Sequence, residues 1–120
     1  MANPNIATAQ NIYGTTATYV GVPTNLTLIG GSSTPANRVR RINTIMAVNK
    51  NGTSSYDITV AYYTGSYIYL ASTISVPADS TLVIVSKDTA IYLMEGHAIY
   101  AMASSAGTID IIMSYEEIYA

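Results

Sequence analysis

The chain has 120 residues and no cysteine, which is the size of one domain that must hold together by packing, without disulfides or thiolate metal sites. Its net charge of −2, with 10% charged residues, excludes the basic field that nucleic acids or anionic membranes attract. Hydrophobic residues make up 49% and the aromatic residues are all tyrosines, 11 of them, which suits half-buried surfaces and protein interfaces better than a dry core.

The N-terminal segment lacks the basic and apolar regions of a secretory signal, and no apolar run is long enough for a membrane helix. We therefore expect a protein that is made and used in soluble form. Residues 1–17 are polar, with Ile6, Ile12 and Tyr13 as isolated apolar side chains, and we expect an extended N-terminal arm that orders against a neighbouring subunit. Residues 18–120 are expected to form a single β domain.

Alternating and β-branched segments separated by turn residues predict strands along the rest of the chain. They lie at residues 18–22, 25–29, 40–48, 57–63, 67–76, 82–85, 91–93, 98–103 and 108–116. The glycine- and serine-rich residues 30–37 form a loop, where we expect the most mobility. No amphipathic helix is found. The predicted fold is all-β, a single antiparallel β-sandwich of about eight strands with jelly-roll-like order.

Period-two alternation also predicts which side chains are buried. In the long strand, Ile42 and Met46 are expected to share the inner face. Residues 82–85 and 109–113 are apolar on both faces, so we expect cover on both sides, from this domain or a partner chain. The expected core comprises Ile42, Met46, Ile58, Val60, Ile74, Val76, Leu82, Ile84, Leu93, Ile99, Ile111 and Met113.

Residues with catalytic or metal-binding potential are few. His97 is the single histidine, with Glu95 near it in a turn, and no further ligand has the spacing for a metal site. Glu116 and Glu117 are adjacent on a strand, so their carboxylates point to opposite faces and are unable to flank one substrate. No nucleophile-elbow pattern surrounds any serine. We expect no enzyme activity, no metal, no cofactor and no small-molecule substrate.

Three of the five basic residues, Arg38, Arg40 and Arg41, are concentrated at the start of the long strand. They are candidates for gripping an acidic surface of a partner or for touching nucleic acid. The alternative is a solvated strand end, and charge pattern alone leaves these readings open.

Four tyrosines, Tyr62, Tyr63, Tyr67 and Tyr69, fall on one predicted hairpin. A tyrosine-rich hairpin fits a protein–protein contact, and a sugar platform fits as well. Because so low a charge would leave an isolated domain with contiguous apolar surface, we expect self-association through this hairpin and through the apolar backs of the two-sided strands.

Several stretches resemble a group of small virion structural proteins of tailed bacteriophages, especially phages of marine cyanobacteria. The resembling segments are residues 1–6, 12–14, 41–45, 71–82, 91–96, 103–107 and 114–118, and the densest likeness lies after residue 70. His97 departs from the group, which tends to carry an acidic residue at that position. These motifs are structural signatures without chemistry.

The resemblance implies a virion structural protein, and a capsid decoration (cement) protein is the leading interpretation. Such a protein would be made in the host cytoplasm and would bind outside the major capsid shell, with the major capsid protein, other virion proteins and its own copies as partners and no role for nucleic acid or membrane. A homotrimer is the specific prediction, because a trimer matches the local three-fold sites between capsid hexamers. Candidate shell-binding residues are Ile6, Ile12, Tyr13, Arg38, Arg40 and Arg41. The alternatives are a neck, tail or fibre component, or a carbohydrate-binding module for host adsorption.

Overall fold

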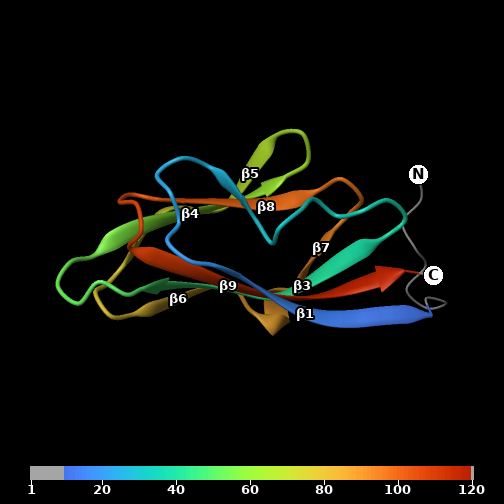
Figure 1. Cartoon of the computed structure of the whole chain (residues 1–120), viewed down its shortest axis with the longest axis horizontal. Helices are drawn as coiled ribbons and strands as arrows, with labels where there is room; N and C mark the ends of the chain where they lie inside the picture. The colour runs from blue at the N-terminus through green and yellow to red at the C-terminus, as the bar shows by residue number, and fades with distance from the viewer. Residues whose placement is uncertain (1–9, 120) are drawn as a thin grey trace.

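A computed structural model describes residues 10–119, which form strands and one short 3₁₀ turn arranged in two layers (Figure 1). The strands are β1 (Asn11–Tyr19), β2 (Thr27–Ile29), β3 (Val39–Asn49), β4 (Tyr56–Tyr63), β5 (Tyr67–Val76), β6 (Thr81–Val85), β7 (Ile91–Leu93), β8 (Ala98–Ala103) and β9 (Ile109–Tyr119), with the 3₁₀ turn η2 at Lys87–Thr89. Within residues 10–119, no helix is long and apolar enough to cross a bilayer.

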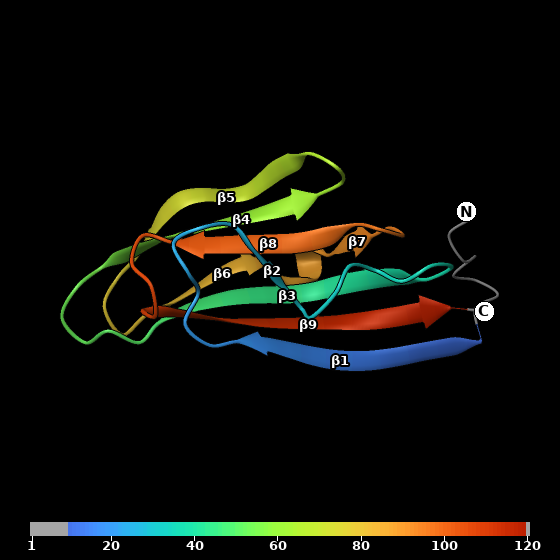
Figure 2. The same cartoon turned by 45° about the horizontal axis from the view of Figure 1, so that its top comes forward.

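The two layers are antiparallel sheets, which can be told apart in Figure 2. Sheet A has the strand order β1-β9-β3-β6, with β7 pairing beside β6 on β3, and sheet B has the order β2-β8-β4-β5. Without the short β7, each sheet has four strands, in the orders β1-β9-β3-β6 and β2-β8-β4-β5. These are the strand orders of a jelly roll, which consists of two Greek-key motifs. The predicted all-β sandwich is confirmed.

The core lies between the sheets and consists of aliphatic side chains from the inner faces of both layers. Of the expected core residues, eight are buried: Ile42, Ile58, Val60, Val76, Leu93, Ile99, Ile111 and Met113. Leu82 and Ile84 are half-buried at the margin of this core, and Met46 is half-buried on the outer face of sheet A.

A β-bulge in β3 explains why Met46 is not in the core. The register of β3 against β9 shifts between Ile42 and Thr44, so Asn43 is an extra residue on β3. Such a bulge reverses the alternation that follows it. Ile45 and Ala47 therefore point inward and are fully buried, while Met46 points outward.

The prediction that Ile74 is buried is wrong, because its side chain is 42% exposed. Ile74 lies on β5, which is the edge strand of sheet B. In Figures 1 and 2, β5 lies away from sheet A, so the opposite layer gives the Ile74 side chain little cover. Val83, at 53% exposure, likewise shows that β6 is covered on one face only within this chain. In β9, Ile109 and Ile111 are buried while Ile112 is half-buried on the outer face.

The boundary expected at residue 17 falls inside β1. Residues 11–19 pair continuously with β9, from Asn11 opposite Tyr119 to Tyr19 opposite Ile111. Backbone pairing with a long neighbouring strand needs no apolar pattern, which is why these polar residues belong to the sheet instead of an arm. The earlier part of the expected arm, including Ile6, lies outside the described residues.

The cross-strand pair of Ile58 and Ile74 offers a matched test of this burial pattern, since the two residues lie opposite each other on β4 and β5. Ile58→Ala should lower the free energy of unfolding by about 2–5 kcal/mol, because it opens a cavity in the core. Ile74→Ala should cost about 1 kcal/mol or less, because its side chain is partly solvated already. Urea unfolding of both variants measures the difference, and equal losses would contradict the difference in burial between the central strand β4 and the edge strand β5.

Candidate functional site

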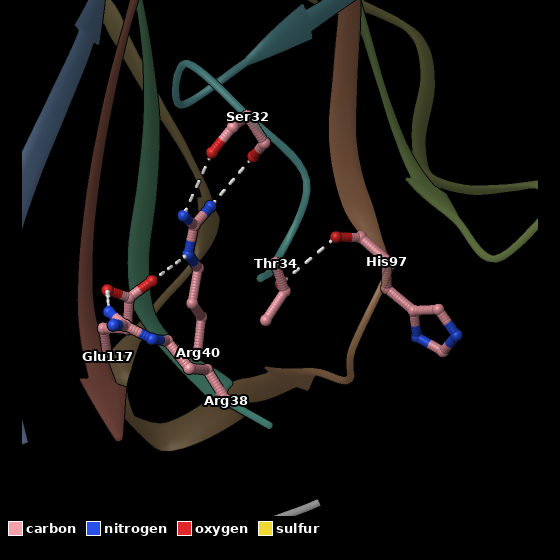
Figure 3. A network of polar contacts seen from close by, with 6 residues as sticks. All are labelled: Ser32, Thr34, Arg38, Arg40, His97 and Glu117. Carbon is pink, nitrogen blue, oxygen red and sulfur yellow. Dashed lines mark hydrogen bonds and ion pairs between the residues drawn. The ribbon is translucent and has the colours of Figure 1, made fainter. Parts of the chain in front are cut away.

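The arginine cluster, formed by Arg38, Arg40 and Glu117, joins the start of β3 to the end of β9 (Figure 3). The Arg40 side chain is only 6% exposed, and its Nε donates to Glu117 Oε1 at 3.0 Å. The other two Arg40 nitrogens donate to the carbonyl oxygen and Oγ of Ser32, and the guanidinium lies 5.0 Å from the Tyr115 ring. Arg40 is therefore satisfied within the chain and is unavailable to a partner.

The same end of the molecule anchors the loop of residues 30–37, which the sequence suggested as the most mobile segment. Besides the bonds to Ser32, Thr34 is buried and donates from its backbone nitrogen and its hydroxyl to the carbonyl of His97 at 3.0 and 3.2 Å (Figure 3). Gly96 donates in return to the carbonyl of Thr34. The loop is thus tied to both β3 and the turn before β8.

Its two arginine partners keep the Glu117 carboxyl in the ionised form. Burial alone would raise the pKa of the Glu117 carboxyl, but the hydrogen bonds and positive charges of Arg40 and Arg38 outweigh it and hold the pKa below the usual 4.5. Glu117 is ionised at neutral pH and balances a buried guanidinium, so the pair is a structural element of the sandwich.

Arg38 differs from Arg40 because it reaches solvent. It donates to Glu117 Oε2 at 2.8 Å, its side chain is 36% exposed, and its guanidinium lies 4.0 Å from the centre of the Tyr119 ring. Tyr119 in turn stacks on Tyr13 of β1, with ring centres 5.8 Å apart. Tyr13 is 52% exposed and forms an accessible surface with Arg38 and Tyr119, and Ile12, 53% exposed, lies on the opposite face of the same edge strand; the exposed edge of β1 with these residues is here called the β1 surface.

Arg41 points to the opposite face of sheet A from Arg40. It faces Glu116 at 4.0 Å, and Glu116 accepts a hydrogen bond from Asn43 at 3.2 Å. Glu116 and Glu117 therefore point to opposite faces, as adjacent strand residues do. The three arginines that were expected to act together therefore have different environments. Arg40 is in a buried ion pair, Arg38 stacks on Tyr119 at the surface, and Arg41 lies on the outer face of sheet A.

The outer face of sheet B holds a cluster of tyrosines, called here the tyrosine face: Tyr63, Tyr67, Tyr69 and Tyr100. The rings of Tyr63, Tyr67 and Tyr100 contact one another, with centres 4.9 to 5.3 Å apart. Tyr67 and Tyr69 are 42% and 51% exposed. Desolvation raises the pKa of Tyr67 and its tyrosine neighbours raise it further, so the hydroxyl is neutral at physiological pH.

Tyr62 does not belong to this face, because it lies on the inner side of β4. Its hydroxyl donates to the carbonyl of Tyr92 at 2.8 Å and lies 2.8 Å from Nδ1 of His97. A hydroxyl has one hydrogen to donate, so the proton of the second contact belongs to His97 Nδ1. Burial raises the pKa of Tyr62. This pair links β4 to the turn before β8 and has a structural role.

A cavity of about 180 Å³ opens near the tyrosine face, between β4, β5 and β8. This cavity, called here the threonine pocket, is lined by Thr24, Asp57, Thr59, Thr73, Met102 and Ser104. Thr73 has a φ of +52°, a left-handed conformation that a β-branched residue rarely adopts, and it marks a bulge in β5. Its backbone nitrogen donates to Thr59 Oγ1 at 2.9 Å, which holds the bulge over β4.

Residues 10–119 bring no three His, Cys, Asp or Glu side chains close enough together to hold a metal ion. Comparison of the chain with known protein families and with curated protein sequences finds no match. A function for this chain must therefore be argued from its own surfaces.

Two features of these surfaces were missed by the sequence reasoning. Tyr100 joins the tyrosine face from β8, and the only advance signal was its place in an alternating strand. The threonine pocket depends on the bulge at Thr73, and nothing in the local sequence marks a β-branched residue for a left-handed conformation.

Replacing Glu117 tests the arginine cluster. Glu117→Gln should lower the free energy of unfolding by about 1–3 kcal/mol at neutral pH, because the charge of Arg40 remains buried without its counterion. The folded pKa of Glu117 lies below 4.5, so its stabilisation is present above the unfolded value and is lost as the pH falls through the folded value. Urea unfolding should therefore show the difference between wild type and variant shrinking on acidification.

The matched control is Glu116→Gln, since Glu116 is 35% exposed and 4.0 Å from Arg41. It should change stability by about 1 kcal/mol or less. Equal losses in the two variants, or a difference that does not respond to pH, would show that the cluster is not an important source of stability.

Replacing Thr73 tests the strain in the bulge. Thr73→Gly should raise the melting temperature, because relief of the left-handed penalty, about 1–2 kcal/mol, exceeds the added chain entropy of glycine, about 0.5–1 kcal/mol. The control Ser72→Gly lacks this relief and should lower the melting temperature. Thermal unfolding followed by circular dichroism compares the two, and a loss of stability in both would argue against strain at Thr73.

Proposed function

We propose that the chain is a structural protein of a bacteriophage virion, and specifically a capsid decoration (cement) protein that binds outside the major capsid shell and stabilises it. The likeness of several stretches to small phage virion proteins supports this. The proposal assigns no catalytic activity. The structural observation that supports it best is the β1 surface.

β1 is an edge strand of sheet A, and six of its nine residues are exposed. It contains no charged residue and no proline, the usual devices that protect an exposed edge from pairing with another chain. An edge of this kind fits a strand or extended segment of a neighbouring subunit, which would complete its hydrogen bonds. Ile12 and Tyr13 supply apolar contact area, and Arg38 beside Tyr119 supplies a charge for an acidic partner residue.

A neck, tail or fibre component would use the same edge, so location within the particle separates the alternatives. We expect hundreds of copies per purified particle for a decoration protein and a few dozen or fewer for a neck or tail component. Quantitative mass spectrometry gives this number, and the position of the chain in a particle reconstruction gives the location. The homotrimer expected from the local three-fold sites of a capsid stays a prediction, for which the mass of the purified protein in solution is the test.

A single charge placed in β1 tests the attachment surface. Tyr13→Asp should reduce the copies per particle tenfold or more, since a carboxylate in a buried strand interface is desolvated without a partner; a tenfold loss corresponds to about 1.4 kcal/mol. Tyr92→Asp is the matched control, because Tyr92 is also an exposed tyrosine, on β7. Full occupancy by the Tyr13 variant, with its fold confirmed by circular dichroism, would exclude the β1 surface as the attachment site.

A further inference from the structure

The threonine pocket and the tyrosine face lie on one continuous surface. Across β4 and β8, Thr59 pairs with Met102, Ala61 with Tyr100, and Tyr63 with Ala98. These pairs are two residues apart along each strand, so they share the outer face of sheet B at intervals of roughly 7 Å. A hollow whose surface is mainly apolar but which carries several hydroxyl groups therefore leads directly into an aromatic surface, with the small side chain of Ala61 between them.

The polar atoms of the pocket are suited to a ligand rich in hydroxyl groups. Thr24, Thr59, Thr73 and Ser104 contribute hydroxyls, and Asp57 contributes a carboxylate. The Oγ atoms of Thr59 and Ser104 accept backbone hydrogen bonds from Thr73 and Asp57 and retain their own hydrogens for donation. None of the hydrogen bonds or ion pairs found among residues 10–119 uses the Asp57 carboxylate.

The charge of the surface narrows the class of ligand. Asp57 is the single charged residue in the four strands of sheet B. Because these strands contain no lysine or arginine, this face has no positive charge to pair with the negative charge of a phosphate, sulfate or carboxylate ligand. A second copy of the chain docked here would desolvate the Asp57 carboxylate with no cation from the same face to pair with it. A neutral ligand that donates hydroxyl hydrogens avoids both problems.

The tyrosine rings fit the apolar side of such a ligand. Tyr67 and Tyr69 are partly exposed, and an exposed ring offers a rigid, amphipathic surface at low cost in rotamer entropy. The rings of Tyr63, Tyr67 and Tyr100 contact one another, so they form a surface for stacking and not a cage around a cation. The left-handed Thr73 in the wall of the pocket is an independent sign, because backbone strain is concentrated at binding sites.

From these contacts we propose that the outer face of sheet B binds a neutral oligosaccharide. One sugar unit would place its hydroxyls in the threonine pocket, with Asp57 accepting from them, and a following unit would lie with its C–H face on the tyrosine face. This site lies away from the β1 surface, since β1 and β5 lie at opposite sides of the molecule (Figures 1 and 2). The inference does not depend on attachment to a virion.

The test is titration of the full chain with four neutral tetrasaccharides, built from α-glucose, β-glucose, mannose or N-acetylglucosamine units, each to about 10 mM, a range that covers millimolar affinity. Two-dimensional amide NMR spectra should show saturable shifts for at least one sugar, centred on Thr59, Thr73, Tyr100 and Ser104. Asp57→Asn and Tyr67→Ser should each weaken that affinity about tenfold or more. Thr73→Gly removes a pocket hydroxyl and should also weaken the affinity for the sugar. Because this variant is expected to stabilise the fold, its loss of affinity would not be attributable to unfolding.

The matched controls are Asp88→Asn, on the exposed turn η2, and Tyr92→Ser, on β7, which should leave the affinity unchanged. No shift with any of the four sugars would overturn the proposal, as would shifts that map elsewhere or resist both site variants. Shifts of these residues with tetralysine instead of a sugar would assign the face to a basic peptide. Shifts that depend on protein concentration alone would assign it to a second copy of the chain, and both results would refute a glycan site.

Discussion

The antiparallel pairing of β3 with β9 is the contact on which the rest of sheet A depends. β1 is held in the sheet by β9, while β6 and β7 are held by β3. The bulge at Asn43 sets which residues of β3 enter the core. A polar contact secures each end of β3: Arg40 binds Glu117 at the start, and at the end the buried amide of Asn49 donates to the carbonyl of Val76. The contact of Asn49 with Val76 of β5 joins the two sheets, whereas the contact of Arg40 with Glu117 lies within sheet A.

Local sequence pattern was enough to predict the strands from β2 onward, and the segment 98–103 agrees in both bounds with β8, but most of β1 was expected to be an arm. Alternation also identified most of the core, because a half-buried strand repeats its environment every second residue. It failed where the partner strand decides the outcome. The bulge at Asn43 arises from pairing with the distant strand β9, the bulge at Thr73 from pairing with β4, and the burial of Arg40 depends on Glu117, far away in the sequence. The candidate surfaces were therefore predicted in part: Tyr13, Tyr63 and Tyr67 were named, but Tyr119 and Tyr100, which contact them, were not.

The two sheets differ in chemistry. The charged strand residues are concentrated in sheet A, where most of them form ion pairs with one another, whereas the strands of sheet B carry Asp57 alone. The sandwich thus has an exposed edge strand without charged residues, β1, on one layer and a face with a single charged residue on the other. The jelly-roll order permits this separation, because β1 and β3 belong to one layer while β2 and the β4–β5 hairpin belong to the other.

The pairing of β1 with β9 also has a consequence for how the protein is made. Thr16 and Ser114 face each other across this ladder, although 98 positions separate them in the chain. On a ribosome, β1 emerges long before its partner has been synthesised, so sheet A closes only once the segment that forms β9 has left the exit tunnel. Folds with such distant pairings close a large loop before they gain contacts, and they fold slowly. During that interval both edges of the unfinished sheet are exposed, and unpaired strand edges of this kind are where incomplete chains aggregate.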